Sequence, residues 1–311
     1  MKKTFLIILF ALISFSINAQ VSPLSVKGTN IVDDKGNIVH LRGVSFSWHN
    51  WWSQYYTANM VNEMKNSWHC NIVRASIGIG PSNDYVQDPQ KGQSCLDSVV
   101  LAAIKQNLYV IIDFHAHELN TKVAASFFKK QAKKYGSYPN VIFELFNEPV
   151  NQPWSELKEY AQNISKIIRK YSKNIILMGT PQWCQQINLA INNPIKGIDN
   201  LMYTFHFYAN THKEVLRESM EKALKAGVPV FISECGAMSA DGNGEINEEE
   251  FGKWIDLAES YNIAEIFWSI ADKEEICSVL KPNTNPYLPL KDHDITEWGL
   301  FVKKYLLEHN K

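Results

Sequence analysis

The chain has 311 residues, with 31 basic and 32 acidic side chains and a formal net charge of −1 at pH 7. This even balance excludes a global electrostatic field that would draw nucleic acid or an anionic surface to the protein. Hydrophobic residues make up 45% of the chain, which is typical of an ordinary globular protein long enough to bury a sizeable core.

The first 19 residues have the composition of a secretory signal peptide. Two lysines follow Met1, residues 6–15 are almost wholly apolar, and the small residues before Gln20 suit a cleavage site near Ala19. The apolar run is too short to span a bilayer comfortably, and no later stretch is apolar enough to do so. We therefore expect a secreted or periplasmic protein that consists of residues 20–311 after cleavage and has no membrane partner.

Five cysteines are scattered along the chain without a C-x-x-C pair: Cys70, Cys95, Cys184, Cys235 and Cys277. This spacing argues against zinc-ribbon and thioredoxin-like sites. In an exported chain the odd count leaves at least one free thiol, and it leaves one or two disulfides open.

Short β-branched or aromatic runs alternate with longer amphipathic segments from about residue 40 onward. The runs predict eight strands, at residues 41–46, 71–77, 109–115, 141–146, 174–179, 201–207, 228–234 and 264–268. Apolar residues at three- and four-residue spacing predict helices at residues 94–106, 122–135, 153–171, 211–226, 248–261 and 298–308. This alternation predicts a single α/β domain, a (β/α)8 TIM barrel. A doubly wound open sheet is the alternative, but no Gly-rich phosphate loop follows the first strand.

In a (β/α)8 barrel the reactive side chains gather at the C-terminal ends of the strands. Five predicted strands end on such side chains: Asp113, His115 and His117 on the third, Asn147 and Glu148 on the fourth, His206 and Tyr208 on the sixth, Glu234 on the seventh, and Trp268 on the eighth. Glu148 and Glu234 would face each other across the mouth of the barrel. A separation on the order of 5 Å suits double displacement at a sugar anomeric carbon, whereas roughly 6.5 Å or more would indicate inversion.

Seven segments carry a resemblance to a known family. They are Leu41–Val44 (LRGV), Asn71–Arg74 (NIVR), Val110–His115 (VIIDFH), Val141–Pro149 (VIFELFNEP), Met202–Tyr208 (MYTFHFY), Val230–Glu234 (VFISE) and Phe267–Ser269 (FWS). Asn-Glu-Pro alone is a weak motif, but it is specific at the end of an apolar strand that a second strand-terminal glutamate follows. From about Gly28 to its C-terminus the chain resembles glycoside hydrolase family 5, in particular its bacterial cellulase subfamily.

The resemblance implies a retaining endo-β-1,4-glucanase with Glu148 as acid/base and Glu234 as nucleophile. It implies that five residues hold these glutamates and the sugar hydroxyls: Arg74, His115, Asn147, His206 and Tyr208. It makes Trp268 the floor of the subsite for the cleaved sugar. It implies further substrate contacts for Trp183, Lys273 and Glu275, although the last two could instead form a solvated charge cluster.

The first-strand loop departs from the family pattern. Many relatives carry a histidine soon after the Arg-Gly of this strand, whereas this chain offers Trp48 first and His49 after it. Sugar stacking is expected there, and Trp48, Trp51 and Trp52 are all candidates for it.

Physical reasoning predicts different settings for the two glutamates. Arg74 and Tyr208 beside Glu234 would keep that side chain ionised as a nucleophile, while a less polar setting would raise the pKa of Glu148. Asn147 and Glu148 are adjacent, so both can reach the cleft only if the strand breaks at Asn147.

Two further side chains are predicted to point inward. Glu144 should lie inside the barrel as the structural partner of a basic group, since catalytic groups sit at strand ends. His117 shares a face with His115, and the pattern leaves open whether it lines the site or has a structural role.

No metal or organic cofactor is expected. Asp241–Glu245 (DGNGE) lacks the glycine and glutamate that an EF-hand requires at its sixth and twelfth positions, so we expect a solvated turn there. Two carboxylates and water complete the reaction by themselves. The expected partner is a β-linked polysaccharide or oligosaccharide, bound by a monomer. Mannan, mixed-linkage glucan and xyloglucan are alternative substrates, and a carbohydrate-binding barrel without catalysis is the alternative function.

Overall fold

Eight parallel strands close into a barrel in the computed structural model, which describes residues 21–310. The strands are β3 (Arg42–Phe46), β4 (Ile72–Gly78), β5 (Tyr109–His115), β6 (Val141–Glu144), β7 (Ile176–Met178), β8 (Leu201–Tyr208), β9 (Val230–Gly236) and β10 (Glu265–Ile270). Their order around the barrel follows the chain, and β10 pairs with β3 to close it. The (β/α)8 prediction is therefore confirmed, whereas the predicted leader, residues 1–19, lies outside the described residues.

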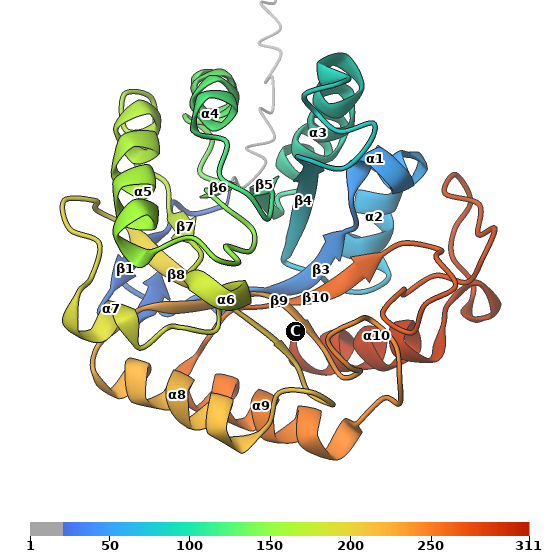
Figure 1. Cartoon of the computed structure of the whole chain (residues 1–311). Helices are drawn as coiled ribbons and strands as arrows, with labels where there is room; N and C mark the ends of the chain where they lie inside the picture. Colours follow the sequence, from blue (N-terminus) through green and yellow to red (C-terminus); the bar gives the residue numbers. More distant parts are fainter. Residues whose placement is uncertain (1–20, 311) are drawn as a thin grey trace, which may run out of the picture.

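A ring of helices surrounds the strands. The long ones are α2 (Ala58–Asn66), α3 (Pro89–Lys105), α4 (Thr121–Tyr135), α5 (Trp154–Ile168), α8 (Glu214–Lys225), α9 (Glu248–Tyr261) and α10 (Glu297–His309). Figure 1 shows α3, α4 and α5 on one side of the strands and α8, α9 and α10 on the other. Helix α2 was not predicted, because its asparagines mask the apolar spacing. Its N-terminal cap is Thr57, whose side chain accepts a hydrogen bond from Met60 N at 3.1 Å.

An antiparallel hairpin precedes the barrel and was also not predicted. It consists of β1 (Ser25–Lys27) and β2 (Asn30–Val32). Ile31 and the preceding Leu24 belong to a small apolar cluster with residues at the strand starts, among them Leu41 and Ile72. The hairpin therefore covers the N-terminal end of the barrel and leaves the C-terminal end free for the site.

The register of the strands brings polar side chains to the same height inside the barrel. Ser45 on β3 pairs with Arg74 on β4, and Asp113 on β5 pairs with Glu144 on β6. All four side chains are fully buried. Buried polar groups need hydrogen-bond partners, so these four side chains must find theirs among the polar groups inside the barrel.

A β-bulge interrupts the pairing of β8 with β9. Phe205 pairs with Ile232 and the next residue, His206, pairs with Glu234, so Ser233 is the extra residue on β9. A bulge places two residues of one strand opposite a single residue of its partner. It thereby allows the adjacent Ser233 and Glu234 to turn into the barrel together.

Two further findings concern the described part of the chain. No helix in residues 21–310 is long and apolar enough to cross a membrane. All five cysteines lie in this range, and each is buried with a free thiol, so the disulfides that the sequence left open are not formed.

Candidate active site

Glu148 and Glu234 meet at the C-terminal mouth of the barrel. An oxygen of one lies within 4.8 Å of an oxygen of the other, and both lie within that distance of a ring nitrogen of His206. Glu148 follows β6 with its side chain 14% exposed, and Glu234 lies near the end of β9 with its side chain 7% exposed. The structure thus brings together the two acids that the strand ends predicted.

Arg74 links the polar groups inside the barrel. Its Nε donates to Glu144 at 2.7 Å, its Nη1 to Glu234 at 3.1 Å, and its Nη2 to Asn147 at 2.6 Å. Nη2 also lies 3.0 Å from Asp113. Burial raises the pKa of Asp113 and that of Glu144 to about 6, although Arg74 opposes both shifts. The prediction that Glu144 is the partner of an inward basic group is confirmed.

Tyr208 provides the second contact of Glu234. Its hydroxyl donates to Glu234 Oε1 at 2.8 Å, while Arg74 occupies Oε2. Burial raises the pKa of Tyr208 well above its ordinary value, so the phenol keeps its hydrogen and acts as a donor. Both oxygens of Glu234 therefore accept hydrogen bonds, one of them from a cation.

Two histidines hold Glu148. His206 Nδ1 lies 2.8 Å from its Oε1, and His117 Nε2 lies 3.1 Å from its Oε2. Burial alone would raise the pKa of Glu148, but hydrogen bonding with His117 and His206 outweighs burial and lowers that pKa. The predicted upward shift is wrong, because sequence spacing could not show that two ring nitrogens meet this carboxylate.

The strand break predicted at Asn147 is confirmed and begins earlier in the chain. Strand β6 ends at Glu144, and the backbone N–H groups of Asn147 and Glu148 donate to Phe114 O and Ala116 O, each at 3.2 Å. Asn147 accepts from Arg74 through Oδ1, which leaves its buried Nδ2 without a partner among the described residues. A hydrogen-bond donor is therefore available beside the two carboxylates.

Two hollows contain the residues predicted to bind substrate. The larger, of about 590 Å³, contains both glutamates and is also lined by His117, Trp183, Gln185, His206, Tyr208, His212, Ala240 and Asp241. The smaller, of about 200 Å³, is lined mainly by aromatic and polar side chains, which include Trp48, Trp51, Trp52, Trp268, Lys273 and Glu275. All predicted substrate contacts therefore line one hollow or the other.

Aromatic rings form the walls of both hollows. The rings of Trp48 and Trp51 have their centroids 5.3 Å apart, and Trp268 stacks on His115 with an angle of 5° between the ring planes. Trp51 and Trp183 are each 46% exposed. Exposed indole faces beside a polar site suit the apolar face of a sugar ring.

Lys273 and Glu275 form an ion pair of 2.8 Å at the edge of the smaller hollow. The lysine side chain is 49% exposed and that of the glutamate is 15% exposed. Both line the hollow together with the tryptophans, and their contact with a sugar stays a prediction.

Comparison with known proteins identifies the family. The family model "Cellulase (glycosyl hydrolase family 5)" matches residues 32–274, a span that includes both glutamates and the Arg74 network. The chain belongs to glycosyl hydrolase family 5. It is therefore a glycoside hydrolase.

Individual proteins that the family 5 hydrolase resembles are consistent with this family assignment. Endoglucanase Z of Dickeya dadantii is 38% identical over 95% of the chain and 69% of its own length. A solved structure from Cytophaga hutchinsonii is 41% identical with a TM-score of 0.90 and covers 93% of this chain and 95% of that one. The Thermobifida fusca endoglucanase Cel5A catalytic domain, in complex with cellotetraose, is 27% identical with a TM-score of 0.87. The match covers 92% of this chain and 97% of that one. The chain spans from 57% to 76% of the length of several curated endoglucanases and a curated cellulase that it matches.

Some residues of the family 5 hydrolase site were not predicted. Gln185, His212 and Asp241 line the larger hollow, and Gln185 Nε2 lies 3.1 Å from His212 Nε2. Ser233 was overlooked because the period of a regular strand would turn it away from the side of Glu234. The bulge in β9 turns Ser233 inward. The residue spacing within one strand does not show where a bulge falls, so nothing in the sequence indicated Ser233.

Every oxygen of the two carboxylates has a hydrogen-bond partner. Among the described residues, Glu148, His206 and Glu234 come close enough together to ligate a metal ion. Yet His117 and His206 occupy the oxygens of Glu148, while Arg74 and Tyr208 occupy those of Glu234. The geometry is that of a hydrogen-bonded acid pair.

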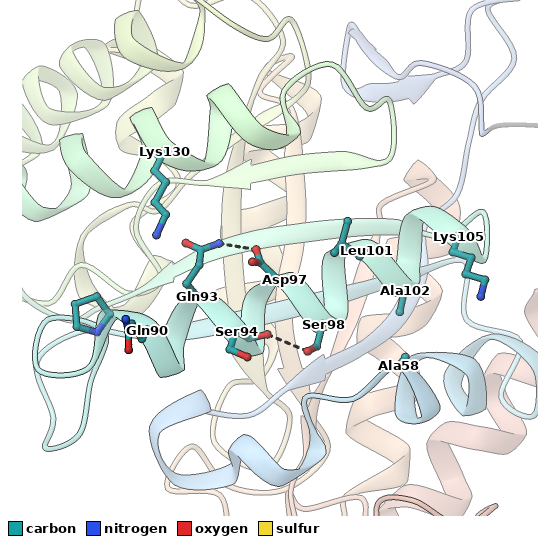
Figure 2. Close-up of a pocket in the computed structure, with 11 residues that line it drawn as sticks. Ala58, Gln90, Gln93, Ser94, Asp97, Ser98, Leu101, Ala102, Lys105 and Lys130 are labelled. Atoms are coloured by element: carbon teal, nitrogen blue, oxygen red, sulfur yellow. Dashed lines mark hydrogen bonds between the residues drawn. The ribbon is translucent and has the colours of Figure 1, made fainter.

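A larger groove of about 690 Å³ lies on the outside of the barrel along α3 (Figure 2). Its single carboxylate, Asp97, accepts hydrogen bonds from Gln93, Lys134 and Tyr135. A glycosidase needs two acids on either side of the bond that it cleaves. The cleft at the barrel mouth therefore remains the candidate active site of this hydrolase, although the outer groove is larger.

Proposed function

We propose that this family 5 hydrolase is a retaining endo-β-1,4-glucanase, with Glu234 as nucleophile and Glu148 as acid/base. The observation that carries the proposal is the separation of the two carboxylates, whose oxygens approach within 4.8 Å. Retaining glycosidases hold their carboxyl groups about 5–5.5 Å apart, whereas inverting ones leave roughly 6.5–9.5 Å for a water molecule. So close an approach of the nearest oxygens is expected for the shorter, retaining separation of the carboxyl groups, and it supports double displacement.

In the first step Glu234 attacks the anomeric carbon and forms a glycosyl ester as the glycosidic bond breaks. Glu148, paired with His206, gives its proton to the departing oxygen, so that the leaving sugar departs as an alcohol. In the second step Glu148 takes a proton from water, which attacks the ester and releases the sugar. The anomeric configuration is inverted twice and therefore retained.

The surrounding side chains suit this chemistry. Arg74 and Tyr208 orient the attacking carboxylate, and the unpartnered Nδ2 of Asn147 can donate to a sugar hydroxyl. Hydrogen bonds to the sugar 2-hydroxyl strengthen in the transition state of glycosidases. The stacking of Trp268 on His115 supports the proposal that Trp268 forms the floor of the subsite for the cleaved sugar.

Glucan is the preferred substrate class because curated relatives are named endoglucanases and a structural relative is solved with cellotetraose. The substrate can be tested by measuring new reducing ends on carboxymethyl cellulose, lichenan, xyloglucan and mannan. We expect the highest kcat/KM on β-1,4-glucans. Hydrolysis of mannan alone would reject the glucanase assignment. If no polymer gave new reducing ends, a binding function would be favoured.

The roles of the two glutamates can be separated by azide rescue of alanine variants. With an activated aryl β-cellobioside, Glu148→Ala should form a β-glycosyl azide, since azide attacks the glycosyl ester. Glu234→Ala should instead yield the α-anomer by direct attack. The Asp97→Asn variant, altered in the outer groove, is the matched control and should keep wild-type activity. Full activity of Glu234→Ala without azide would reject the nucleophile assignment.

We also propose that the enzyme acts outside the cytoplasm, in the periplasm or medium. The support is the basic start and apolar run of residues 1–15, together with a polymeric substrate that cannot enter a cell. N-terminal sequencing of exported protein should begin near Gln20. An intact N-terminus on protein that stays in the cytoplasm would contradict export.

A further inference from the structure

The hydroxyl of Ser233, the bulge residue of β9, connects two groups of the barrel interior. Its Oγ lies 2.6 Å from Glu144 Oε1 and 2.9 Å from His206 Nε2. All three side chains are buried, with at most 1% of their surface exposed. The contacts form a chain from Glu144 through Ser233 to the histidine that holds Glu148.

The direction of these hydrogen bonds follows from the number of hydrogens. An ionised carboxylate can only accept, and Glu144 already accepts from Arg74 through its other oxygen at 2.7 Å, so the single hydrogen of Ser233 points to Glu144. The serine oxygen must then accept from His206. Nε2 of His206 therefore carries a hydrogen.

The other ring nitrogen faces Glu148. A neutral imidazole with its hydrogen on Nε2 has only a lone pair on Nδ1. Nδ1 lies 2.8 Å from Glu148 Oε1, and a hydrogen bond of this length requires a proton between the two atoms. With Nε2 committed to Ser233, that proton is the one that Glu148 would give to the leaving sugar.

We propose that Glu144 and Ser233 fix the hydrogen of His206 on Nε2 and thereby keep the acid/base proton in the contact between Glu148 and His206 Nδ1. Ser233 is a positioning residue that acts on Glu148 through His206. The inference rests on the proposed function and deepens it, because it says what keeps the general acid protonated.

Other groups also face this pair from the surrounding elements. The ionisable groups whose charge acts on Glu148 or His206 are Arg74 on β4, Asp113 and His115 on β5, His117 after β5, Glu144 on β6, His212 after β8, and Glu234 on β9. Tyr208 and Cys184 also lie nearby, and burial raises the pKa of each well above its ordinary value, which keeps both neutral. Within residues 21–310, the hydrogen-bond partner of His206 Nε2 is Ser233, so this serine sets that hydrogen.

Removal of the hydroxyl has a specific consequence. In Ser233→Ala, Nε2 loses its acceptor, and His206 can move its hydrogen to Nδ1 and donate it to an ionised Glu148. That arrangement holds one proton fewer and lacks the proton for the leaving group. The general acid should therefore lose its proton at a lower pH, while Ser233→Thr keeps a hydroxyl and should rescue it.

The kinetic test compares pH profiles of kcat/KM on cellotetraose and on dinitrophenyl β-cellobioside, whose leaving group needs no proton. For Ser233→Ala on cellotetraose, we expect the pH at which kcat/KM falls on the basic side to be lower by about one pH unit. At pH values above this fall, kcat/KM should be about tenfold below that of the wild type. Rates on the activated substrate should change less than about twofold. Ser233→Thr and Ser45→Ala, a buried barrel serine that does not contact His206, should keep the wild-type basic limb. An unchanged basic limb in Ser233→Ala, or equal losses on both substrates, would overturn the proposal.

A second test does not depend on hydrolysis. NMR of the histidine ring nitrogens in isotope-labelled enzyme should show a hydrogen on Nε2 of His206 in the wild type at neutral pH, and tautomer exchange in Ser233→Ala. A hydrogen on Nδ1 with a bare Nε2 in the wild type would refute the proposal. If Nε2 carries the hydrogen but the wild type cleaves no glycoside, the tautomer assignment stands and the proposed function fails.

Discussion

Arg74 donates to Glu144 through a 2.7 Å hydrogen bond deep inside the barrel, and neither side chain has any exposed surface. The same guanidinium contacts Asp113 and Glu234, so one cation serves three carboxylates. Glu144 in turn accepts from Ser233, which lies against His206. A continuous set of hydrogen bonds thus joins the proposed nucleophile to the partner of the proposed acid.

Replacement of Arg74 should be costly to stability. Arg74→Lys keeps the charge but loses the planar fork that reaches its partners together, and it leaves buried carboxylates unpaired. Breaking a buried pair in this way costs about 3–5 kcal/mol, which urea unfolding would measure. Lys225→Ala, which removes an exposed ion pair with Glu221 on α8, is the control and should leave the unfolding midpoint unchanged. Equal midpoints for wild type and Arg74→Lys would show that the network does not stabilise the fold.

Glu265, at the start of β10, should make the enzyme less stable at alkaline pH. Burial raises the pKa of Glu265 from its ordinary 4.5 to about 8, against the opposing charge of Arg42, and its Oε1 has no partner among the described residues. Between these two values the folded state binds a proton that the unfolded state has released. Stability from this group is therefore full below the unfolded value and is lost as pH rises toward about 8.

The test of this pH effect is Glu265→Gln, which removes the ionisation. The Tm of the variant minus that of the wild type should be a few degrees larger at about pH 9 than at about pH 5. Glu259→Gln alters the more exposed partner of Arg42, whose pKa burial would raise but hydrogen bonding to Arg42 lowers, so its Tm difference should stay constant over the alkaline range. A Tm difference for Glu265→Gln that does not vary with pH would contradict the prediction.

Trp51 and Trp183 should contribute to substrate binding and little to folding, since each is 46% exposed and lines one of the two hollows. Alanine at either position should raise KM on cellooligosaccharides about threefold to tenfold, as expected for loss of one aromatic contact. The Tm should stay close to that of the wild type. Tyr287→Ala removes a 69% exposed ring that lines neither hollow and should leave KM unchanged. Wild-type KM values in both tryptophan variants would exclude a stacking role.

The five cysteines should behave as buried free thiols. A thiol reagent should label none of them in the native enzyme and all five after unfolding, because each is buried and unpaired. Added reductant should not change the Tm. Fewer than five thiols in the unfolded, unreduced protein would reveal a disulfide and contradict the structure.

Gly43 on β3 should tolerate no side chain. A Cβ atom at this position would lie 1.8 Å from the backbone oxygen of Ile72 on β4, so Gly43→Ala must separate two paired strands. We expect loss of soluble folded protein. Gly252 within α9 has no atom within 4 Å of an added Cβ, and Gly252→Ala should stabilise the helix by about 0.5–1 kcal/mol in urea unfolding. A folded Gly43→Ala enzyme of wild-type stability would disprove the close approach.

The sequence by itself determined the barrel and the position of its acids. Strand β5 and helix α9 were predicted with their observed bounds, because each has a clear apolar period within one segment. Parallel strands of a barrel end on the same side, so Glu148 and Glu234 could be placed together without coordinates. Helix α2 and the first hairpin escaped prediction, since their apolar patterns are short and depend on packing against the barrel.

Only the tertiary structure decided the electrostatics of the site. The pKa of Glu148 depends on hydrogen bonding with His117 and His206, which overcomes its burial, and both histidines lie far from it in the chain. The role of Ser233 depends on a bulge between β8 and β9, which changes the direction of its side chain. Residue spacing along one strand fixes neither feature. Both arise because interactions between neighbouring strands determine which atoms meet, and hydrogen bonding between those atoms then determines where the protons lie.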